Sequence, residues 1–253
     1  MRPQSFTADR LARMAAHGRA AASCADTAVD WTVPVKPPAW LPARGYITAI
    51  SQFYYGELAT IEICKRILPE LRDPSAARFV RTQIADEERH AALYARYLGE
   101  VGGIGEIEEG VAMAYRGARA WRGSHHGPII LSHVVLEGEG LRLQNLYSRW
   151  FACPLYQQIN RVVARDEARH VAFGKIYLRG TLPRLPIEER IETFRWIRSL
   201  WFDCAHALRR EMPQSVLLLL GRKWMADRWQ QQSRGLVDIG LVGVDELALI
   251  EGS

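Results

Sequence analysis

The sequence predicts an all-α protein, and three of its features support this. From residue 43 onwards, apolar residues recur at three- and four-residue steps, the spacing of a helix with one buried face. No segment keeps the alternating apolar and polar order of a strand between turn residues. The motif D-E-x-R-H occurs at 86–90 and again at 166–170, and its Glu and His, three residues apart, share one face of a helix. We therefore expect a helical bundle with both motifs on its inner faces.

Residues 1–42 are expected to form an arm followed by a proline-rich extended segment. Residues 1–30 are rich in Ala and Arg and only weakly helical in pattern, so we expect them to be partly ordered. Residues 31–42 contain four prolines, which cannot continue a helix. This segment should run across the bundle, pinned by Trp31 and Trp40.

Residues 43–180 should form a four-helix bundle, with helices at about 43–71, 74–98, 128–151 and 154–179. Asp73 and Pro74 supply an N-cap and a proline at the first helical position of the second helix. Pro128 and Pro154 mark the starts of the third and fourth helices in the same way. A glycine-rich acidic loop and a short helix should join the second helix to the third.

Residues 181–253 should form a C-terminal helical extension packed on the bundle. Pro213 separates two helices that we expect at 186–212 and 214–232, both rich in Trp and Leu. The tail from Gly235 alternates small and apolar residues, and we expect no chemistry there.

Composition excludes several classes of protein. The chain has 253 residues, of which 48% are hydrophobic and 24% charged, as in one globular domain. Its charge of +5 and pI of about 9.2 come from scattered arginines rather than a basic tract, so we interpret the excess charge as a solvated surface rather than a nucleic-acid-binding site. The four cysteines have no C-x-x-C spacing, and no apolar run reaches membrane-spanning length. These features indicate reduced thiols in a cytoplasmic protein.

The spacing of acidic residues predicts a metal site. A lone Glu stands thirty residues before each motif Glu (87 minus 57 and 167 minus 137). A single Glu is usually solvated and a single apolar-face His usually packs in a core, but here apolar residues flank the acids at helical spacing. Four buried carboxylates at one level repel one another, and divalent cations remove that repulsion. Carboxylates with imidazoles in a helical bundle suit a pair of iron or manganese ions. The predicted ligands are Glu57, Glu87, His90, Glu137, Glu167 and His170.

The ligand on the third helix has an alternative. Glu137 and Glu139 are two residues apart and point about 200° apart on an ideal helix, so only one can face inward. Symmetry between the two halves and apolar neighbours favour Glu137. Gly138 and Gly140 flank it, and they suggest either space beside the metals or close helix packing.

Neighbouring residues have predicted supporting roles. Asp86 and Asp166 each precede a motif Glu, and we expect each to accept a hydrogen bond from the metal-binding His of the opposite motif; the alternative is an ordinary surface Asp. His133, one helical turn before Glu137, is assigned to packing or to a position beside the ligands, with a seventh ligand as the alternative. Tyr94 follows His90 by one turn, where a redox role competes with simple packing.

The six ligand positions resemble those of the ferritin-like diiron carboxylate superfamily, and the resemblance covers about 43–180. The stretch 166–170 resembles the matching motif of acyl-carrier-protein desaturases and aldehyde-deformylating oxygenases. Residues 137–147, with Asn145 and Tyr147, are similar to the third-helix segment of the latter. Tyr94 lies where ribonucleotide reductase small subunits carry their radical tyrosine.

The chain also departs from several branches of that superfamily. No Thr lies one turn after Glu137, unlike bacterial multicomponent monooxygenases, and Val163 replaces the extra His of p-aminobenzoate N-oxygenases. The length and C-terminal helices fit neither bacterioferritins nor the longer reductase subunits. The resemblance therefore leaves the subfamily open.

The resemblance implies an oxidase or oxygenase with two Fe ions, or with Mn/Fe as the alternative. Its expected partners are O2, a small or medium-sized organic substrate, an external electron donor and a second copy of the chain in a homodimer. A ferroxidase or iron-handling protein and a radical-generating subunit are the alternatives. The basic pI adds a tRNA-modifying hydroxylase as a weaker one.

Overall fold

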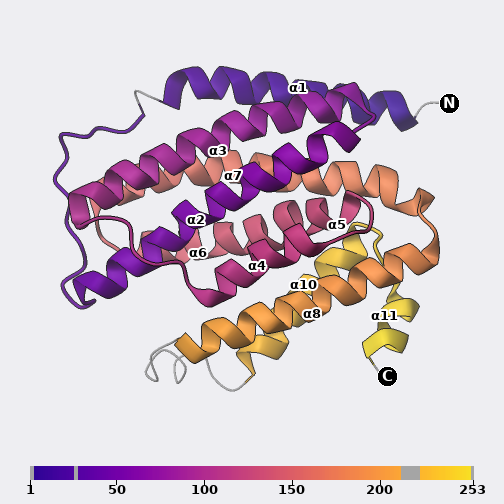
Figure 1. Cartoon of the computed structure of the whole chain (residues 1–253). Coiled ribbons are helices and arrows are strands. Elements are labelled where there is room, and N and C mark those ends of the chain that lie inside the picture. The colour runs from indigo at the N-terminus through magenta and orange to yellow at the C-terminus, as the bar shows by residue number, and fades with distance from the viewer. Residues whose placement is uncertain (1–2, 26–27, 212–222, 252–253) are drawn as a thin grey trace. The chain divides into compact units, whose positions relative to one another are not determined.

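The computed structural model describes residues 3–25, 28–211 and 223–251 (Figure 1). Within these residues the backbone forms helices and turns and no strand, which confirms the predicted all-α class. Contacts group the chain into two units, residues 1–107 with 136–173 and residues 108–135 with 174–253. The division into arm, bundle and C-terminal extension stays a prediction.

The first unit contains helices α1 (Pro3–Ala25), α2 (Ala43–Ile67), α3 (Pro74–Val101), α6 (Glu137–Trp150) and α7 (Pro154–Thr181) as far as Phe173. Helices α2 and α3 pack along each other, and α1 lies along α3 (Figure 1). Leu11 and Ala15 of α1 are fully buried, and they share one helix face because they are four residues apart. This packing explains why the segment is a regular helix where the sequence suggested a partly ordered arm.

The proline-rich segment before α2 is not helical, as its sequence predicts. The backbone N–H of Asp30 donates to the side chain of Gln158 at 2.8 Å, and that of Lys36 lies 3.4 Å from Cys153 Sγ, so the segment is tied to the start of α7. Trp31 stacks under the Arg96 guanidinium, whose Cζ lies 3.8 Å from the ring centroid. Trp40 remains largely exposed.

Helix α3 begins as the sequence predicts. The Asp73 side chain accepts a hydrogen bond from Ser75 N at 2.8 Å, and Pro74 occupies the first turn. The helix continues past the predicted end at residue 98 to Val101. It stops at Gly102, whose φ of 125° is a conformation that side chains other than glycine rarely adopt.

The third predicted helix is interrupted rather than continuous. A short α5 (His126–Ile129) leads into the π-helix η2 (Ile130–Leu136), and α6 begins at Glu137. A π-turn changes the angle between successive side chains. Such turns are rare in proteins as a whole, and those that occur often lie at functional sites. The prediction that His133 and Glu137 share a face assumed α-helical spacing, which η2 does not have.

The second unit contains α4 (Glu109–Ala120), α5, the end of α7, η3 (Leu182–Arg184), α8 (Ile187–Glu211), α10 (Trp224–Asp238) and α11 (Val244–Glu251). Helix α4 packs along α8, and Trp121 stacks on Trp196 with 4.4 Å between ring centroids. The helix predicted at 186–212 matches α8. The one predicted at 214–232 lies partly outside the described residues.

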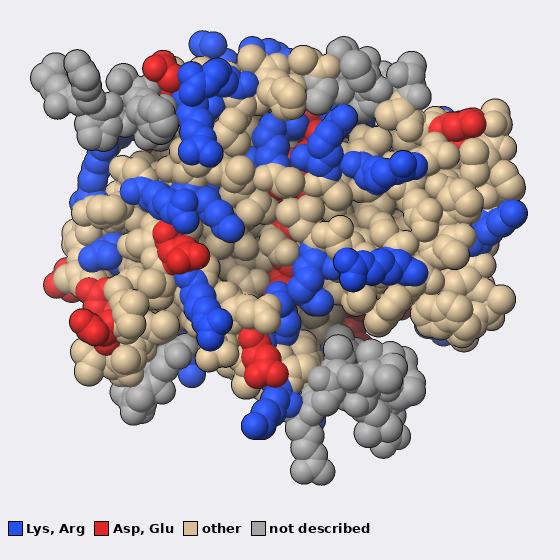
Figure 2. All heavy atoms as spheres, turned by 180° about the vertical axis from the view of Figure 1, so that it is seen from behind, with Lys and Arg blue, Asp and Glu red and all other residues tan. Residues whose placement is uncertain are grey.

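Surface and cysteine features can be stated for the described residues. On the face seen in Figure 2, Lys and Arg side chains are interspersed with uncharged residues and some Asp and Glu. Cys64, Cys153 and Cys204 are free thiols, and the side chain of Cys24 lies outside the described part. None of the described helices combines the length and apolar character that crossing a membrane requires.

Candidate metal centre

The first unit brings the six predicted ligand side chains together in its interior. All six are buried, and each of α2, α3, α6 and α7 contributes at least one. They form two groups in which the potential ligand atoms lie within 4.8 Å of one another. One group is Glu57, Glu87, His90 and Glu167, and the other is Glu87, Glu137, Glu167 and His170. Glu87 and Glu167 belong to both groups, as two carboxylates that bridge a pair of ions would.

Both histidines turn Nδ1 toward the shared carboxylates. His90 Nδ1 lies 3.3 Å from Glu87 Oε2, 3.3 Å from Glu167 Oε1 and 3.6 Å from Glu57 Oε2. His170 Nδ1 lies 3.1 Å from Glu87 Oε1 and 3.7 Å from Glu167 Oε2. Nδ1 is therefore the ring atom that each histidine offers to an ion.

The other ring nitrogen of each histidine faces an aspartate of the opposite motif. His90 Nε2 lies 3.4 Å from Asp166 Oδ2, and His170 Nε2 lies 3.3 Å from Asp86 Oδ2. An aspartate in this position accepts a hydrogen bond from Nε2–H and so keeps Nδ1 turned toward the carboxylates. Both aspartates are fully buried, unlike ordinary surface residues.

Two arginines that the sequence analysis overlooked tie these aspartates together. Arg89 donates to Asp86 at 2.9 Å and to Asp166 at 2.7 Å. Arg169 donates to Asp166 at 2.9 Å and also to Asp86. We call these four residues the Arg–Asp quartet. The sequence feature that could have indicated the quartet is the Arg at the fourth position of both D-E-x-R-H motifs.

Burial and mutual repulsion make the carboxylates unequal in the protein without ions. Burial, then the negative charge of Glu167, raises the pKa of Glu57 and of Glu137 well above the usual value. Burial would also raise the pKa of Glu87, but the charge and hydrogen bonding of His170, with hydrogen bonding from His90, lower it well below. Glu57 and Glu137 thus hold their protons to a higher pH than exposed glutamates do.

The histidines respond to the same charge. Burial would lower the pKa of both histidines. Hydrogen bonding with Asp166 and Glu167 instead raises the pKa of His90 well above the usual value. The negative charge of Glu87 does the same for His170. The same negative surroundings that raise these pKa values would also favour bound cations.

Glu137 Oε2 is a buried oxygen of the cluster that has no hydrogen-bond partner among the described residues. It belongs to the second donor group. A buried acceptor without a partner is costly, and an ion at this place would satisfy it. The donor set of carboxylate oxygens and imidazole nitrogens fits iron or manganese.

Gln83 is a further polar residue at this site that the sequence analysis did not identify. Its side chain is fully buried, and Nε2 donates to Glu87 Oε1 at 3.0 Å and to Glu137 Oε1 at 2.8 Å. Gln83 precedes Glu87 by four residues on α3, so its helical position was the available signal.

On α6, Glu137 faces the cluster and Glu139 does not. Glu139 is partly exposed and accepts a hydrogen bond from Arg142 at 2.9 Å. A Cβ added at Gly138 or Gly140 would meet no atom within 4 Å. The two glycines thus border open space rather than a closely packed helix.

Tyr94 and His133 are both buried. The Tyr94 hydroxyl accepts a hydrogen bond from Gln144 Nε2 at 3.3 Å, and its ring stacks on Phe53 with 5.7 Å between centroids. Burial, then the neighbouring Tyr156 and Glu57, raises the pKa of Tyr94 and keeps the phenol neutral. His133 lies in η2, in the second unit, where a Cβ added at Gly174 would approach its Cβ to 2.5 Å.

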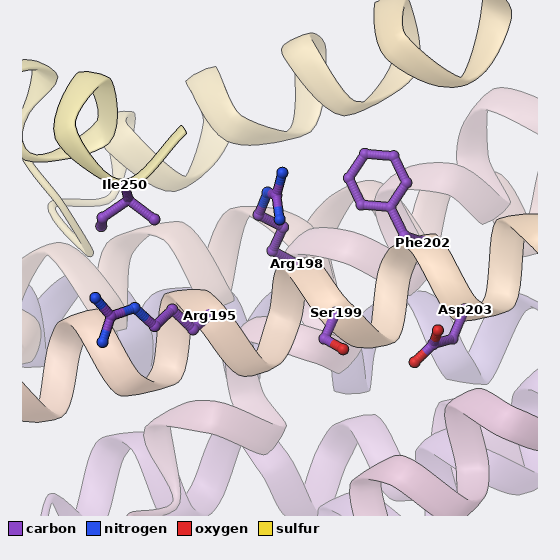
Figure 3. Close-up of a pocket in the computed structure, with 6 residues that line it drawn as sticks. All are labelled: Arg195, Arg198, Ser199, Phe202, Asp203 and Ile250. Carbon is purple, nitrogen blue, oxygen red and sulfur yellow. The ribbon is translucent and has the colours of Figure 1, made fainter. Parts of the chain in front are cut away.

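Two of the surface pockets formed by the described residues are lined by none of the six ligand residues. One, of about 500 Å³, lies between α8 and α11 (Figure 3) and is lined by Arg195, Arg198, Ser199, Phe202, Asp203 and Ile250. The other, of about 610 Å³, lies between α1 and α7 and is lined mainly by Arg10, Arg13, Met14, His17, Arg165 and Arg169.

The fold is similar to two solved structures of variants of an R2-like ligand-binding oxidase, both with a reconstituted Mn/Fe cofactor. One has a TM-score of 0.64 and 16% identity, covering 89% of this chain and 92% of that chain. The other has a TM-score of 0.58 and 15% identity, covering 95% of this chain and 89% of that chain. No protein-family model and no curated protein matches the chain. At this identity the likeness concerns the fold, and it confirms the predicted ferritin-like fold.

Proposed function

We propose that the chain is a dimetal oxidase that uses Fe/Fe or Mn/Fe to activate O2 and oxidise a small or medium-sized organic substrate. The observation that carries the proposal is the pair of buried donor groups that share Glu87 and Glu167. The Mn/Fe cofactor of the R2-like ligand-binding oxidases, whose fold is similar, supports the same choice of metals.

Each ion would be held by one group, with Glu87 and Glu167 between them. Reduced iron or manganese ions bound in this way supply electrons to O2 and so open oxidation chemistry that amino-acid side chains cannot perform. The protein contributes geometry and exclusion of water. Asp86 and Asp166 hold the imidazole protons on Nε2, and burial of all six ligands keeps water away.

The open space beside Gly138 and Gly140 supports a substrate site on α6, next to Glu137. We propose that a largely apolar organic molecule occupies it. Repeated turnover needs electrons from outside, so an external donor is part of the proposal. The cytoplasmic location and the homodimer stay predictions.

A radical-generating subunit is the second candidate, and Tyr94 is the observation that favours it. This phenol follows His90 by four residues, is fully buried and remains neutral. Oxidation of Tyr94 by the loaded site would give a tyrosyl radical once its proton leaves. We keep oxidation of an organic substrate as the main proposal because of the open space on α6.

Mixing the reduced, metal-loaded protein with O2 distinguishes these functions. The optical spectrum, the radical signal in electron paramagnetic resonance and the consumption of O2 are followed with and without panels of organic compounds. We expect O2 consumption coupled to the oxidation of one compound class. Many turnovers of free Fe(II) per chain, with mineral accumulating in a cage-like assembly, would instead identify an iron-handling protein. A stable Tyr94 radical, lost in Tyr94→Phe and indifferent to every compound, would identify the second candidate.

A further inference from the structure

The two donor groups are related by a sequence shift of 80 residues. Glu57 corresponds to Glu137 (137 minus 57), Glu87 to Glu167 (167 minus 87), and His90 to His170 by the same shift. Both members of each pair lie buried in the cluster. If every residue around the cluster had a chemically similar counterpart 80 residues away, the two metal positions would be equivalent.

Gln83 breaks this equivalence. The residue related to it by the same shift is Val163, and both side chains are fully buried. Gln83 Nε2 donates to one oxygen each of Glu87 and Glu137, at 3.0 and 2.8 Å. Val163 has no donor to offer in the other half. In the part of the chain that the structure describes, no other amide side chain donates to a carboxylate of the cluster.

The amide changes what Glu137 presents. Oε1 is engaged by Gln83, while Oε2 is buried without a hydrogen-bond partner. Glu137 therefore enters the second group with one oxygen fixed and the other available. Glu57, its counterpart, accepts no amide hydrogen bond from any residue that the structure describes, and its Oε2 lies 3.6 Å from His90 Nδ1.

A hydrogen bond from an N–H donor restricts the rotation of the carboxylate that accepts it. A ligand that is oriented before the ion arrives binds that ion more tightly. The Gln83 amide orients Glu137, which belongs to one group alone, and it reaches the other group through the shared Glu87.

We propose that Gln83 makes the two metal positions unequal, so that the position of Glu137 and His170 fills first and binds its ion about 10–100-fold more tightly, the size of effect usual for residues that orient ligands. This rests on the proposed dimetal site. Unequal positions are what a protein needs to hold two different ions in a defined order.

The test removes the amide side chain at position 83 and introduces one at the related position 163. Gln83→Met removes the donor at similar length, Val163→Gln adds one at the related place, and the double variant combines the two changes. Gln144→Met is the matched control, because Gln144 is a buried glutamine that donates to Tyr94 rather than to a ligand. Circular dichroism and thermal melting verify that each variant folds.

The probe is Mn(II) alone, without oxygen. Calorimetric titration gives the two binding constants, and anomalous diffraction from crystals with one Mn(II) per chain shows which position is filled. We expect two separate steps in the native protein and in Gln144→Met, with the first ion at Glu137 and His170. The steps should merge in Gln83→Met, and occupancy should move toward Glu57 and His90 in the double variant.

Two results would overturn the proposal. One is equal filling of the two positions in the native protein. The other is an unequal ratio that persists unchanged in a folded Gln83→Met. In both cases two ions still bind, so the dimetal site survives. Failure of the native protein to bind any Mn(II) or Fe(II) would overturn the dimetal site itself.

Discussion

Asp166 Oδ2 lies 3.4 Å from His90 Nε2, although the two residues belong to different motifs and are 76 positions apart. Asp86 and His170 form the reciprocal contact at 3.3 Å. The adjacent residues Asp86 and Glu87 thus serve different purposes: the Glu points to the cluster and the Asp reaches across to the other helix. Orientation of each histidine depends on the opposite half of the chain.

This crossed contact predicts the effect of removing an aspartate. Asp86→Ala and Asp166→Ala should each fold but lose about 10–100-fold in affinity for Mn(II) or Fe(II), because a free imidazole can rotate and change tautomer. Titration calorimetry measures the loss, and the exposed Asp203→Ala is the control. Native affinity in both aspartate variants would show that they do not orient the histidines.

The Arg–Asp quartet should contribute mainly to stability. Arg169→Met leaves two buried aspartates with one arginine between them, and breaking a buried pair costs about 3–5 kcal/mol in free energy of unfolding. We expect the lower end, because Arg89 keeps a contact with each Asp. Arg142→Met, which breaks an exposed pair with Glu139, should cost about 0–1 kcal/mol. Denaturant titration of both variants checks this, and equal small losses would contradict it.

Metal binding should release protons. The surroundings raise the pKa of Glu57, Glu137, His90 and His170, so each holds its proton to a higher pH than an exposed side chain of the same kind. Ions compete with those protons, so affinity should fall as pH is lowered and rise as pH is raised. Titrations at one pH in two buffers of different ionisation enthalpy give the number of protons released. A value of zero would contradict these raised pKa values.

Replacement by alanine should have opposite effects on stability at Gly140 of α6 and Gly174 of α7. Gly140→Ala places a Cβ where no atom lies within 4 Å, so the gain in helix propensity should stabilise the protein by about 0.5–1 kcal/mol. Gly174→Ala should destabilise it, because its Cβ would lie 2.5 Å from the Cβ of His133. Thermal melting distinguishes the two. Destabilisation by Gly140→Ala would mean that the space is filled.

The sequence predicted the elements with strong local signals. Asp73 and Pro74 are the N-cap and the first residue of α3, and together they predicted where that helix begins. The repeated motif and the single Glu thirty residues before each copy predicted six side chains that lie together in the fold. Helical geometry showed that only one of Glu137 and Glu139 can face inward, and symmetry between the two halves with apolar neighbours favoured Glu137.

Features that depend on contacts between helices were not predictable in this way. Spacing could not show that Gln83 reaches Glu137 on another helix, or that Arg89 and Arg169 bridge both aspartates. The π-helix before Glu137 was not predicted, because apolar residues at three- and four-residue steps favour one continuous α-helix. Helix α1 depends on contacts with other helices, since Leu11 and Ala15 are buried.

The most direct test of the dimetal centre is metal analysis of protein loaded with Fe(II) and Mn(II) without oxygen. Two ions per chain are predicted for the native protein. Glu57→Ala, which removes a ligand from one group, should retain about half of the metal, whereas Glu167→Ala, which removes a ligand from both groups, should lose most of it. Full retention of two ions by folded Glu167→Ala and His90→Ala, or native protein that binds no metal, would contradict the account.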